Sequence, residues 1–424
     1  MNKTVFAWLF LLLIFTSFTT PAPGPQYRKA PTLINNMVKA RIDASLKSFV
    51  DSGKVAGVSA LIFEKNKEVY YNAFGHADRE TKTPMDRNTI VRIYSMTKPV
   101  TGVALMQLYE KNLFQLDDPL AKYAPEFAQM KVFKGIDTSG NLILEPAKRP
   151  ITIRDLTRHT AGFATSSDLP AGLAELVKKI DAMNPANTLR QMVLKLANQP
   201  LLFHPGEQWA YGPSVDVQAY LVEQISGKPF DQYLQENIFK PLGMTHTRYI
   251  VPAGDWAKLA GMYRNSPNGP LTRVPDDENS YNIKDWPLKT GGYGLTSTLD
   301  DYMKFAQMLV NKGKWGKALI LKPKTVRLMA TNHLSEDITE RMWLPSKGQV
   351  GFGIDFAVRL RAPATPEENN GVVGEFFWDG AASTLFWVDP VHEITAVLFV
   401  QIMPFSGKLH KSFRDAVYGE YKPQ

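Results

Sequence analysis

Two residues three positions apart could supply a nucleophile and its base. Ser95 and Lys98 form the single Ser-x-x-Lys tetrad in the chain. On a helix, residues at i and i+3 share one face, with Cβ atoms about 5–6 Å apart. A desolvated lysine has a lowered pKa and can accept the serine proton, whereas a charged lysine would stabilise the alkoxide and lower the pKa of a neighbouring tyrosine. Both routes would activate a serine without a histidine.

This chemistry requires a helix that begins close to the serine. Apolar residues at helical spacing predict a helix over residues 95–111. Pro99 fits only the first turn of a helix, which places the helix start near Ser95. Backbone N–H groups and the helix dipole favour negative charge there. The tetrad alone leaves one alternative open, in which Ser95 is a helix N-cap and Lys98 is an exposed side chain.

Composition and missing motifs exclude several other chemistries. The 424 residues include no Cys, which removes disulfides, thiol nucleophiles and the usual structural zinc sites. The net charge of +8 is scattered along the chain, so we expect no nucleic-acid partner. There is no Gly-x-Ser-x-Gly elbow, no His-Glu-x-x-His and no P-loop sequence. We therefore expect neither a metal ion nor a cofactor.

Strand signals lie at both ends of the chain and helical signals lie between them. Strand-like runs cover residues 57–75, 384–388 and 393–400. Helical patterns cover the following ranges: 173–182, 189–197, 215–226, 300–310 and 408–418. This order predicts an α+β fold with an antiparallel sheet flanked by helices and built from both chain ends.

The expected boundaries follow from this arrangement. The sheet region would comprise about 30–115 and 290–424, and an inserted, mainly helical region would comprise about 116–289. Together, residues 26–424 would form a single catalytic unit.

The first 25 residues are expected to lie outside that unit. The apolar stretch Val5–Phe18 is shorter than the roughly 20 residues that span a bilayer, and suits a secretory signal peptide. Proline follows both Ala22 and Gly24, which obstructs cleavage after either residue. Residues 1–25 are therefore predicted to be a signal peptide or a retained N-terminal anchor with a proline-rich linker. In either case the catalytic unit would be exported, as a periplasmic or secreted protein.

The residues around the tetrad resemble a known superfamily. Ile93–Pro99 is similar to the nucleophile motif of serine β-lactamases and penicillin-binding proteins, and closest to the class C-like branch that includes family VIII carboxylesterases. Further matching blocks follow in the family order: Phe74–Asp78, Leu116–Pro119, Ile151–Gly162, Phe203–Gly206, Pro241–Met244 and Gly291–Asp300. The resemblance implies a serine β-lactamase/transpeptidase-like fold and acyl-serine chemistry.

The second motif of this superfamily is a tyrosine, commonly in Tyr-x-Asn. Tyr211 follows a Pro-Gly pair and matches it, so the resemblance implies a proton relay between Ser95 and the leaving group once Lys98 lowers its pKa. Pro213 replaces the asparagine and offers no side-chain hydrogen bond, which weakens a β-lactamase interpretation. Tyr263-Arg264-Asn265 is a literal match in a different family block, and we interpret it as coincidental.

The third motif in true β-lactamases is Lys-Thr-Gly on an edge strand. Lys289-Thr290-Gly291 matches literally but precedes a Gly-Gly turn into a helix, so we interpret it as coincidental too. Trp378-Asp379-Gly380 resembles instead the Trp-x-Gly variant of family VIII esterases.

This resemblance implies roles for the residues of the third motif. Trp378 and Gly380 would contact substrate, with Gly380 letting the strand approach closely. The backbone N–H groups of Ser95 and Ala381 would form the oxyanion hole. Asp379 is unusual for the motif, because a carboxylate there opposes a developing oxyanion unless it points away.

The sequence therefore predicts a serine hydrolase that cleaves small carboxylic esters through an acyl-serine intermediate. Trp378 in place of the motif's lysine favours neutral acyl groups. One alternative keeps this chemistry for amides, as a β-lactamase, D-amino peptidase or oligoamide hydrolase. A second alternative is a catalytically silent penicillin-binding-like module.

Overall fold

The structure is a computed structural model that describes residues 32–163, 169–266, 269–278 and 280–422. Residues Thr32–Gln424 form one compact unit. The predicted signal peptide or anchor lies outside the described residues. Within the described ranges, no helix has both the length and the apolar character needed to cross a membrane.

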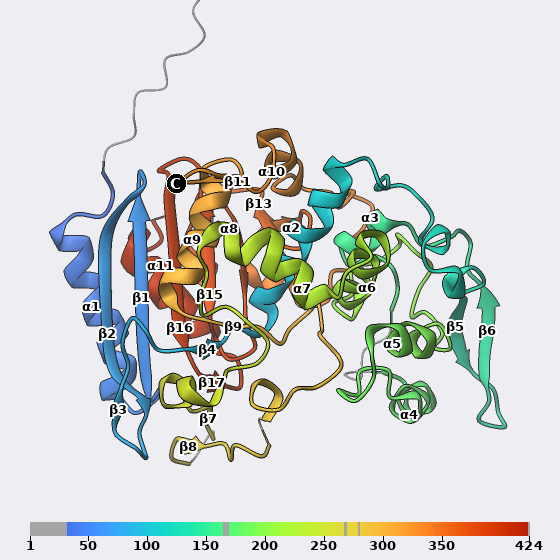
Figure 1. Ribbon diagram of the computed structural model, residues 1–424, viewed down its shortest axis with the longest axis horizontal. Helices are drawn as coiled ribbons and strands as arrows, with labels where there is room; N and C mark the ends of the chain where they lie inside the picture. Colours follow the sequence, from blue (N-terminus) through green and yellow to red (C-terminus); the bar gives the residue numbers. More distant parts are fainter. Residues whose placement is uncertain (1–31, 164–168, 267–268, 279, 423–424) are drawn as a thin grey trace, which may run out of the picture. The chain divides into compact units, whose positions relative to one another are not determined.

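An antiparallel sheet of eight strands forms one side of this unit (Figure 1). The strand order is β12-β13-β14-β15-β16-β1-β2-β3. The strands are β1 (Gly57–Glu64), β2 (Lys67–Asp78), β3 (Thr83–Pro84), β12 (Val350–Phe352), β13 (Ala357–Arg359), β14 (Phe376–Asp379), β15 (Leu385–Asp389) and β16 (Ile394–Val400). Val58 of β1 pairs with Val400 of β16, so the predicted α+β fold with a sheet from both chain ends is confirmed.

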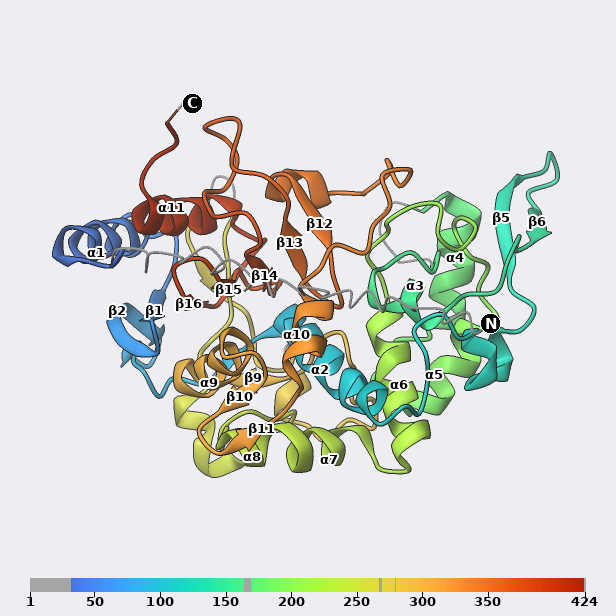
Figure 2. The ribbon, with the colours of Figure 1, turned by 90° about the horizontal axis from the view of Figure 1, so that it is seen from above.

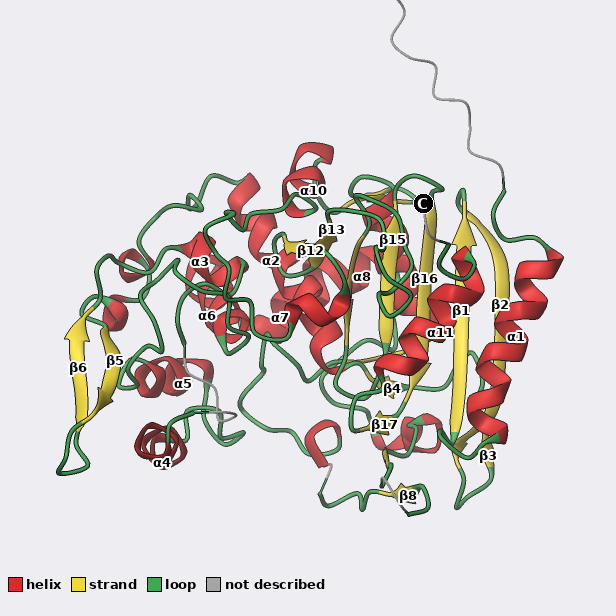
Figure 3. Ribbon diagram, turned by 180° about the vertical axis from the view of Figure 1, so that it is seen from behind, coloured by secondary structure: helices red, strands yellow, loops and turns green. Residues whose placement is uncertain are grey.

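Helices cover both faces of the sheet because its central strands are buried on both sides. All seven residues of β16 are buried. Helices α1 (Asn36–Asp51) and α11 (Gly407–Tyr418) pack together on one face, and α9 (Leu299–Val310) packs on the other (Figures 2 and 3). Strands without a solvated face need apolar cover on both sides, which these three amphipathic helices supply.

The middle of the chain carries a further set of helices. Its helices are α3 (Ile153–Thr157), α4 (Ala171–Ile180), α5 (Leu189–Leu196), α6 (Ser214–Ser226), α7 (Phe230–Leu234) and α8 (Lys240–Leu242). Helix α6 ends as expected at Gly227, whose φ of 69° is left-handed. The sequence patterns did not indicate the hairpin of β5 (Lys131–Ile136) and β6 (Leu142–Pro146), because neither strand has a buried face.

Short elements complete the fold. The remaining strands are β4 (Val91–Arg92), β7 (Tyr263–Arg264), β8 (Thr272–Arg273), β9 (Thr296–Ser297), β10 (Lys314–Trp315), β11 (Ala318–Leu319) and β17 (Ile402–Met403). The remaining helices are α10 (Pro323–Met329) and the short turns η2 (Leu120–Lys122), η3 (Pro125–Phe127), η4 (Gln235–Phe239), η5 (Ala253–Lys258), η6 (Ser280–Asn282) and η7 (Leu344–Lys347).

Helix α2 (Thr97–Glu110) is buried between the sheet and the helical region. Its residues from Thr97 to Met106 are all buried, and it packs against α6 and α7. A helix that is apolar on all sides belongs in a protein interior. The predicted helix over residues 95–111 is present, and its first turn is the 3₁₀ helix η1 (Tyr94–Met96). Pro99 lies in the first turn of α2, where proline is tolerated.

The sheet and α9 hold η1 from two sides. The hydroxyl of Tyr302 in α9 donates to the carbonyl of Met96 over 2.8 Å. The turn after β14 abuts the chain just before η1, since a Cβ on Gly380 would lie 2.5 Å from the carbonyl oxygen of Ile93 and 2.3 Å from Thr384 Oγ1. Gly380 therefore makes a close approach to the protein's own backbone, and its contact with substrate stays a prediction.

Replacing Gly380 should separate β14 from η1. We predict that Gly380→Ala lowers the free energy of unfolding by about 1–3 kcal/mol, because the added methyl group meets backbone that cannot move aside. Gly254→Ala is the matched control, because a Cβ there meets nothing within 4 Å. Urea denaturation would measure both variants, and equal midpoints would contradict the prediction.

Candidate active site

Ser95 and Lys98 lie together at the junction of η1 and α2. Lys98 Nζ lies 3.2 Å from Ser95 Oγ and donates to the carbonyl oxygen of Gly292 over 2.7 Å. The side chain of Lys98 is buried, so the alternative of a helix cap with an exposed lysine is wrong. Tyr94, immediately before the serine, has a left-handed φ of 45°, a strained conformation for a residue with a side chain.

Burial controls the charge of Lys98. Loss of water around the amine lowers the pKa of Lys98 from its ordinary value to about 8. The carboxylates of Asp216, Asp355 and Asp379 act in the opposite direction and favour the ammonium form. The result is an amine that changes its charge in the mildly alkaline range.

A glycine turn positions Lys98 from the side of α6. Asp216 Oδ1 accepts the backbone N–H of Gly292 over 2.9 Å, and burial raises the pKa of Asp216 to about 6, against the influence of Lys98. A Cβ on Gly291 would lie 2.3 Å from the carbonyl oxygen of Val215, so only glycine lets this turn pack against α6. The turn can then present the Gly292 carbonyl to Lys98. Sequence reasoning missed this role of Asp216 and Gly292.

The two literal motif matches, Lys289-Thr290-Gly291 and Tyr263-Arg264-Asn265, make their contacts outside the site. Lys289 is not in a strand, and its amine binds Asp285 and the carbonyl of Trp286. The hydroxyl of Tyr263 binds Glu80 and accepts the backbone N–H of Arg79. Their contacts agree with the interpretation that neither belongs to the site.

Tyr211 reaches Ser95 from the loop before α6. Trp378 Nε1 donates to Tyr211 Oη over 3.2 Å, and Ser95 acts to lower the pKa of the same phenol. Because an indole N–H can only donate, the phenol oxygen accepts from Trp378 and its own proton is directed elsewhere. Aromatic rings enclose Tyr211, with ring centroids 4.7–6.0 Å away in His159, Trp209, Trp343 and Trp378.

The expectation that Lys98 lowers the pKa of Tyr211 is wrong. Burial raises the pKa of Tyr211 far above its ordinary value of 10, and the hydrogen bonds with Ser95 and Trp378 only reduce that rise. Lys98 Nζ lies 4.3 Å from the centroid of the Tyr211 ring, over its face. The phenol therefore stays protonated while the neighbouring amine titrates.

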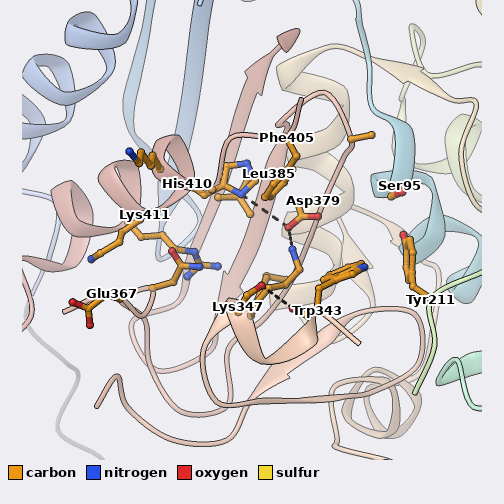
Figure 4. A pocket seen from close by; sticks show the side chains of 17 residues that line it. Ser95, Tyr211, Trp343, Lys347, Glu367, Asp379, Leu385, Phe405, His410 and Lys411 are labelled. Atoms are coloured by element: carbon orange, nitrogen blue, oxygen red, sulfur yellow. Dashed lines mark hydrogen bonds and ion pairs between the residues drawn. The ribbon is translucent and has the colours of Figure 1, made fainter. Parts of the chain in front are cut away.

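A cavity of about 600 Å³ opens beside Ser95 and Tyr211, and we call it the first cavity (Figure 4). Its apolar lining residues are Trp343, Phe377, Ala381, Leu385 and Phe405. No acceptor among the described residues takes the backbone N–H of Ala381. That free donor lies on the same cavity as Ser95, as an oxyanion hole requires.

Trp378 does not contact this cavity, contrary to expectation. Successive side chains of a strand point to opposite faces. On β14, Phe377 and Asp379 line the first cavity, while Trp378 is fully buried behind Tyr211. An aromatic wall of the cavity comes instead from Trp343, which precedes η7.

Asp379 lines the first cavity and forms a buried ion pair with Lys347 of η7. His410 Nδ1 lies 4.0 Å from its carboxylate. The positive charge of Lys347 therefore reduces the expected repulsion between the Asp379 carboxylate and a developing oxyanion. Sequence reasoning missed Lys347 because a single lysine carries no motif.

A second cavity, of about 740 Å³, also opens beside the serine. It is lined by residues of α4 and α6 and by Lys98, and it shares Ser95, Tyr211 and Trp343 with the first cavity. Ser95 thus lies on the lining of both cavities. Within the described part of the chain, no group of three or more acidic or histidine side chains is placed to hold a metal ion.

The family model for Beta-lactamase matches residues 42–418. The chain belongs to the beta-lactamase family. Protein Rv1367c of Mycobacterium tuberculosis is 31% identical over 365 residues, which cover 85% of this chain and 89% of that protein. Lovastatin esterase of Penicillium rubens is 26% identical over 407 residues, covering 90% and 98% of the two chains.

Solved structures of the beta-lactamase family share the fold. The structure of EstCE1, described as a hydrolase with promiscuous acyltransferase activity, matches with a TM-score of 0.75 and 27% identity. The match covers 90% of this chain and 99% of EstCE1. The resemblance read from the motifs is confirmed, and the chain is a serine hydrolase or acyl-transferring enzyme of this family.

Proposed function

We propose that the chain hydrolyses small neutral carboxylic esters, with Ser95 as nucleophile, Lys98 as base and Tyr211 as proton relay. The observation that carries this proposal is the 3.2 Å contact between a buried amine and the serine hydroxyl. With its pKa near 8, Lys98 has a neutral fraction that can accept the proton as Ser95 attacks the ester carbonyl.

The oxyanion formed by this attack is stabilised by two backbone donors. Ser95 and Ala381 both line the first cavity, and their N–H groups would bind the negative oxygen. The proton taken by Lys98 then returns through the Tyr211 phenol to the leaving alcohol, which departs as the carbon–oxygen bond breaks. Water, deprotonated by the same amine, releases the acyl group and regenerates Ser95.

Replacing the nucleophile tests this mechanism directly. We predict that Ser95→Ala lowers kcat for p-nitrophenyl butyrate by roughly 10³-fold or more. The control is Ser346→Ala, because Ser346 lines the same cavity but donates its hydroxyl to the carbonyl of Trp343. A fluorophosphonate should label the wild type and the control at Ser95. Equal rates, or the absence of an adduct, would contradict the mechanism and favour a silent module.

The titration of Lys98 predicts the pH dependence. Only the neutral amine accepts the serine proton, so kcat/KM should rise about tenfold per pH unit below the pKa and level off above about pH 8. Steady-state kinetics between pH 6 and pH 9.5 would measure this profile. A kcat/KM that is flat or falls over this range would exclude Lys98 as the base.

Acyl transfer is a second candidate function, favoured by the two cavities that meet at Ser95. The first cavity would hold the acyl group, and the second could hold an acceptor alcohol in place of water. Lovastatin esterase and EstCE1 act on esters or transfer acyl groups by their descriptions, which supports either outcome.

An added alcohol distinguishes the two outcomes. With 1-butanol present, transfer predicts butyl ester among the products of p-nitrophenyl butyrate, measured by gas chromatography. Ala174→Trp, which fills part of the second cavity, should lower the ester-to-acid ratio several-fold and leave hydrolysis in place. Free acid as the sole product would leave hydrolysis as the function, and faster turnover of nitrocefin than of esters would favour the amide alternative.

A further inference from the structure

The ion pair between Lys347 and Asp379 lies within the first cavity. Both side chains line the cavity, and their residues are only 7% and 8% exposed. The ammonium is enclosed by the rings of Trp343, Trp378 and Phe405, at 4.9–5.2 Å from their centroids. A cation removed from water in this way needs an anion beside it, and Asp379 supplies that anion.

Figure 4 shows this pair part-way along the cavity. Ser95 and Tyr211 lie at one end, and Glu367 and Lys411 lie at the other. An acyl group bound to Ser95 and extending into the cavity would therefore pass the ion pair. The charge at this point therefore lies beside any such acyl chain.

The other ionisable groups of the cavity wall are also compensated. Arg414 pairs with Glu375 over 2.8 Å, and Lys411 pairs with Asp415 over 2.7 Å. Burial lowers the pKa of His410 to about 4, so this ring is neutral at pH 7. The exposed residues Lys408 and Glu367 carry opposite charges. The cavity thus offers its occupant no buried charge that lacks a partner.

We propose that Asp379 determines which acyl groups the enzyme accepts. Its carboxylate pairs with Lys347 and so takes the place that a carboxylate on the acyl chain would otherwise occupy. A carboxylate on the substrate would meet the charge of Asp379 and would have to displace it from Lys347. A neutral chain meets only a compensated pair and aromatic walls. This inference rests on the proposed ester hydrolysis and names the substrate class as esters of neutral acyl groups.

Two esters of equal chain length test the proposal. These are p-nitrophenyl hexanoate, which is neutral, and the mono-p-nitrophenyl ester of adipic acid, which carries a terminal carboxylate. The wild type should prefer hexanoate in kcat/KM. Asp379→Asn frees the ammonium of Lys347, and it should raise the adipate-to-hexanoate ratio on the order of tenfold or more.

Removing the cation in place of the anion should shift the preference toward a positively charged acyl chain. Lys347→Met leaves the carboxylate of Asp379 without its cation, so the ratio of p-nitrophenyl 6-aminohexanoate to hexanoate should rise instead. The double variant, Asp379→Asn with Lys347→Met, has neither charge and should lose both gains. Thermal unfolding of every variant checks folding, and the pair of opposite substitutions keeps the test informative if one of them does not fold.

The outcomes separate this inference from the proposed function. Hexanoate hydrolysis with unchanged ratios in the folded variants would overturn the role of Asp379 and leave the esterase mechanism intact. A wild type that hydrolyses none of the three esters would contradict the proposed function itself.

Discussion

A lysine amine held out of contact with water is the constraint around which the site is arranged. Helix α2 can bury Lys98 because the residues of its first turns are all buried and the helix packs against α6 and α7. Burial drives the amine toward its neutral form, and the Gly292 carbonyl and the nearby carboxylates limit that effect. Without the carboxylates the amine would lose its proton at still lower pH, and without burial it would stay charged.

Burial raises the pKa of the Tyr211 phenol, whereas it lowers the pKa of the Lys98 amine. Tyr211 is buried among aromatic rings and stays neutral, whereas Lys98 titrates near pH 8. The two groups that flank Ser95 therefore differ in what they can do with a proton: the amine can take it, and the phenol can pass it on. Trp378 supports this arrangement from behind, since its N–H fixes the orientation of the phenol oxygen.

Local sequence was sufficient for the residues closest to the chemistry. The spacing of Ser95 and Lys98 and the position of Pro99 fix a helix turn, and that turn brings amine and hydroxyl together with little help from the rest of the fold. The long strands and the amphipathic helices α9 and α11 were predictable for the same reason, because their periodicity reflects which face is buried. Helix α1 was not among the predicted helices. Tyr211 required the family resemblance, since no local pattern connects it to a serine far away in the chain.

The features that could not be predicted depend on contacts between distant segments. The orientation of Trp378 follows from the alternation along β14 and from what lies on each face, and neither is visible in a three-residue motif. Lys347 ends the short helix η7 and meets Asp379 only in the folded chain. The pKa of Tyr211 depends on the aromatic rings around it, which come from several elements.

The pairing of the first long strand with a strand close to the C-terminus has a consequence for biosynthesis. β1 lies inside the sheet between β2 and β16, so one of its edges stays without a partner until the ribosome has made residues 394–400. Ala381, which lines the first cavity, is also translated late. The sheet and the catalytic centre therefore stay incomplete until synthesis of the chain is nearly over. Pairing between strands so far apart in sequence also slows folding.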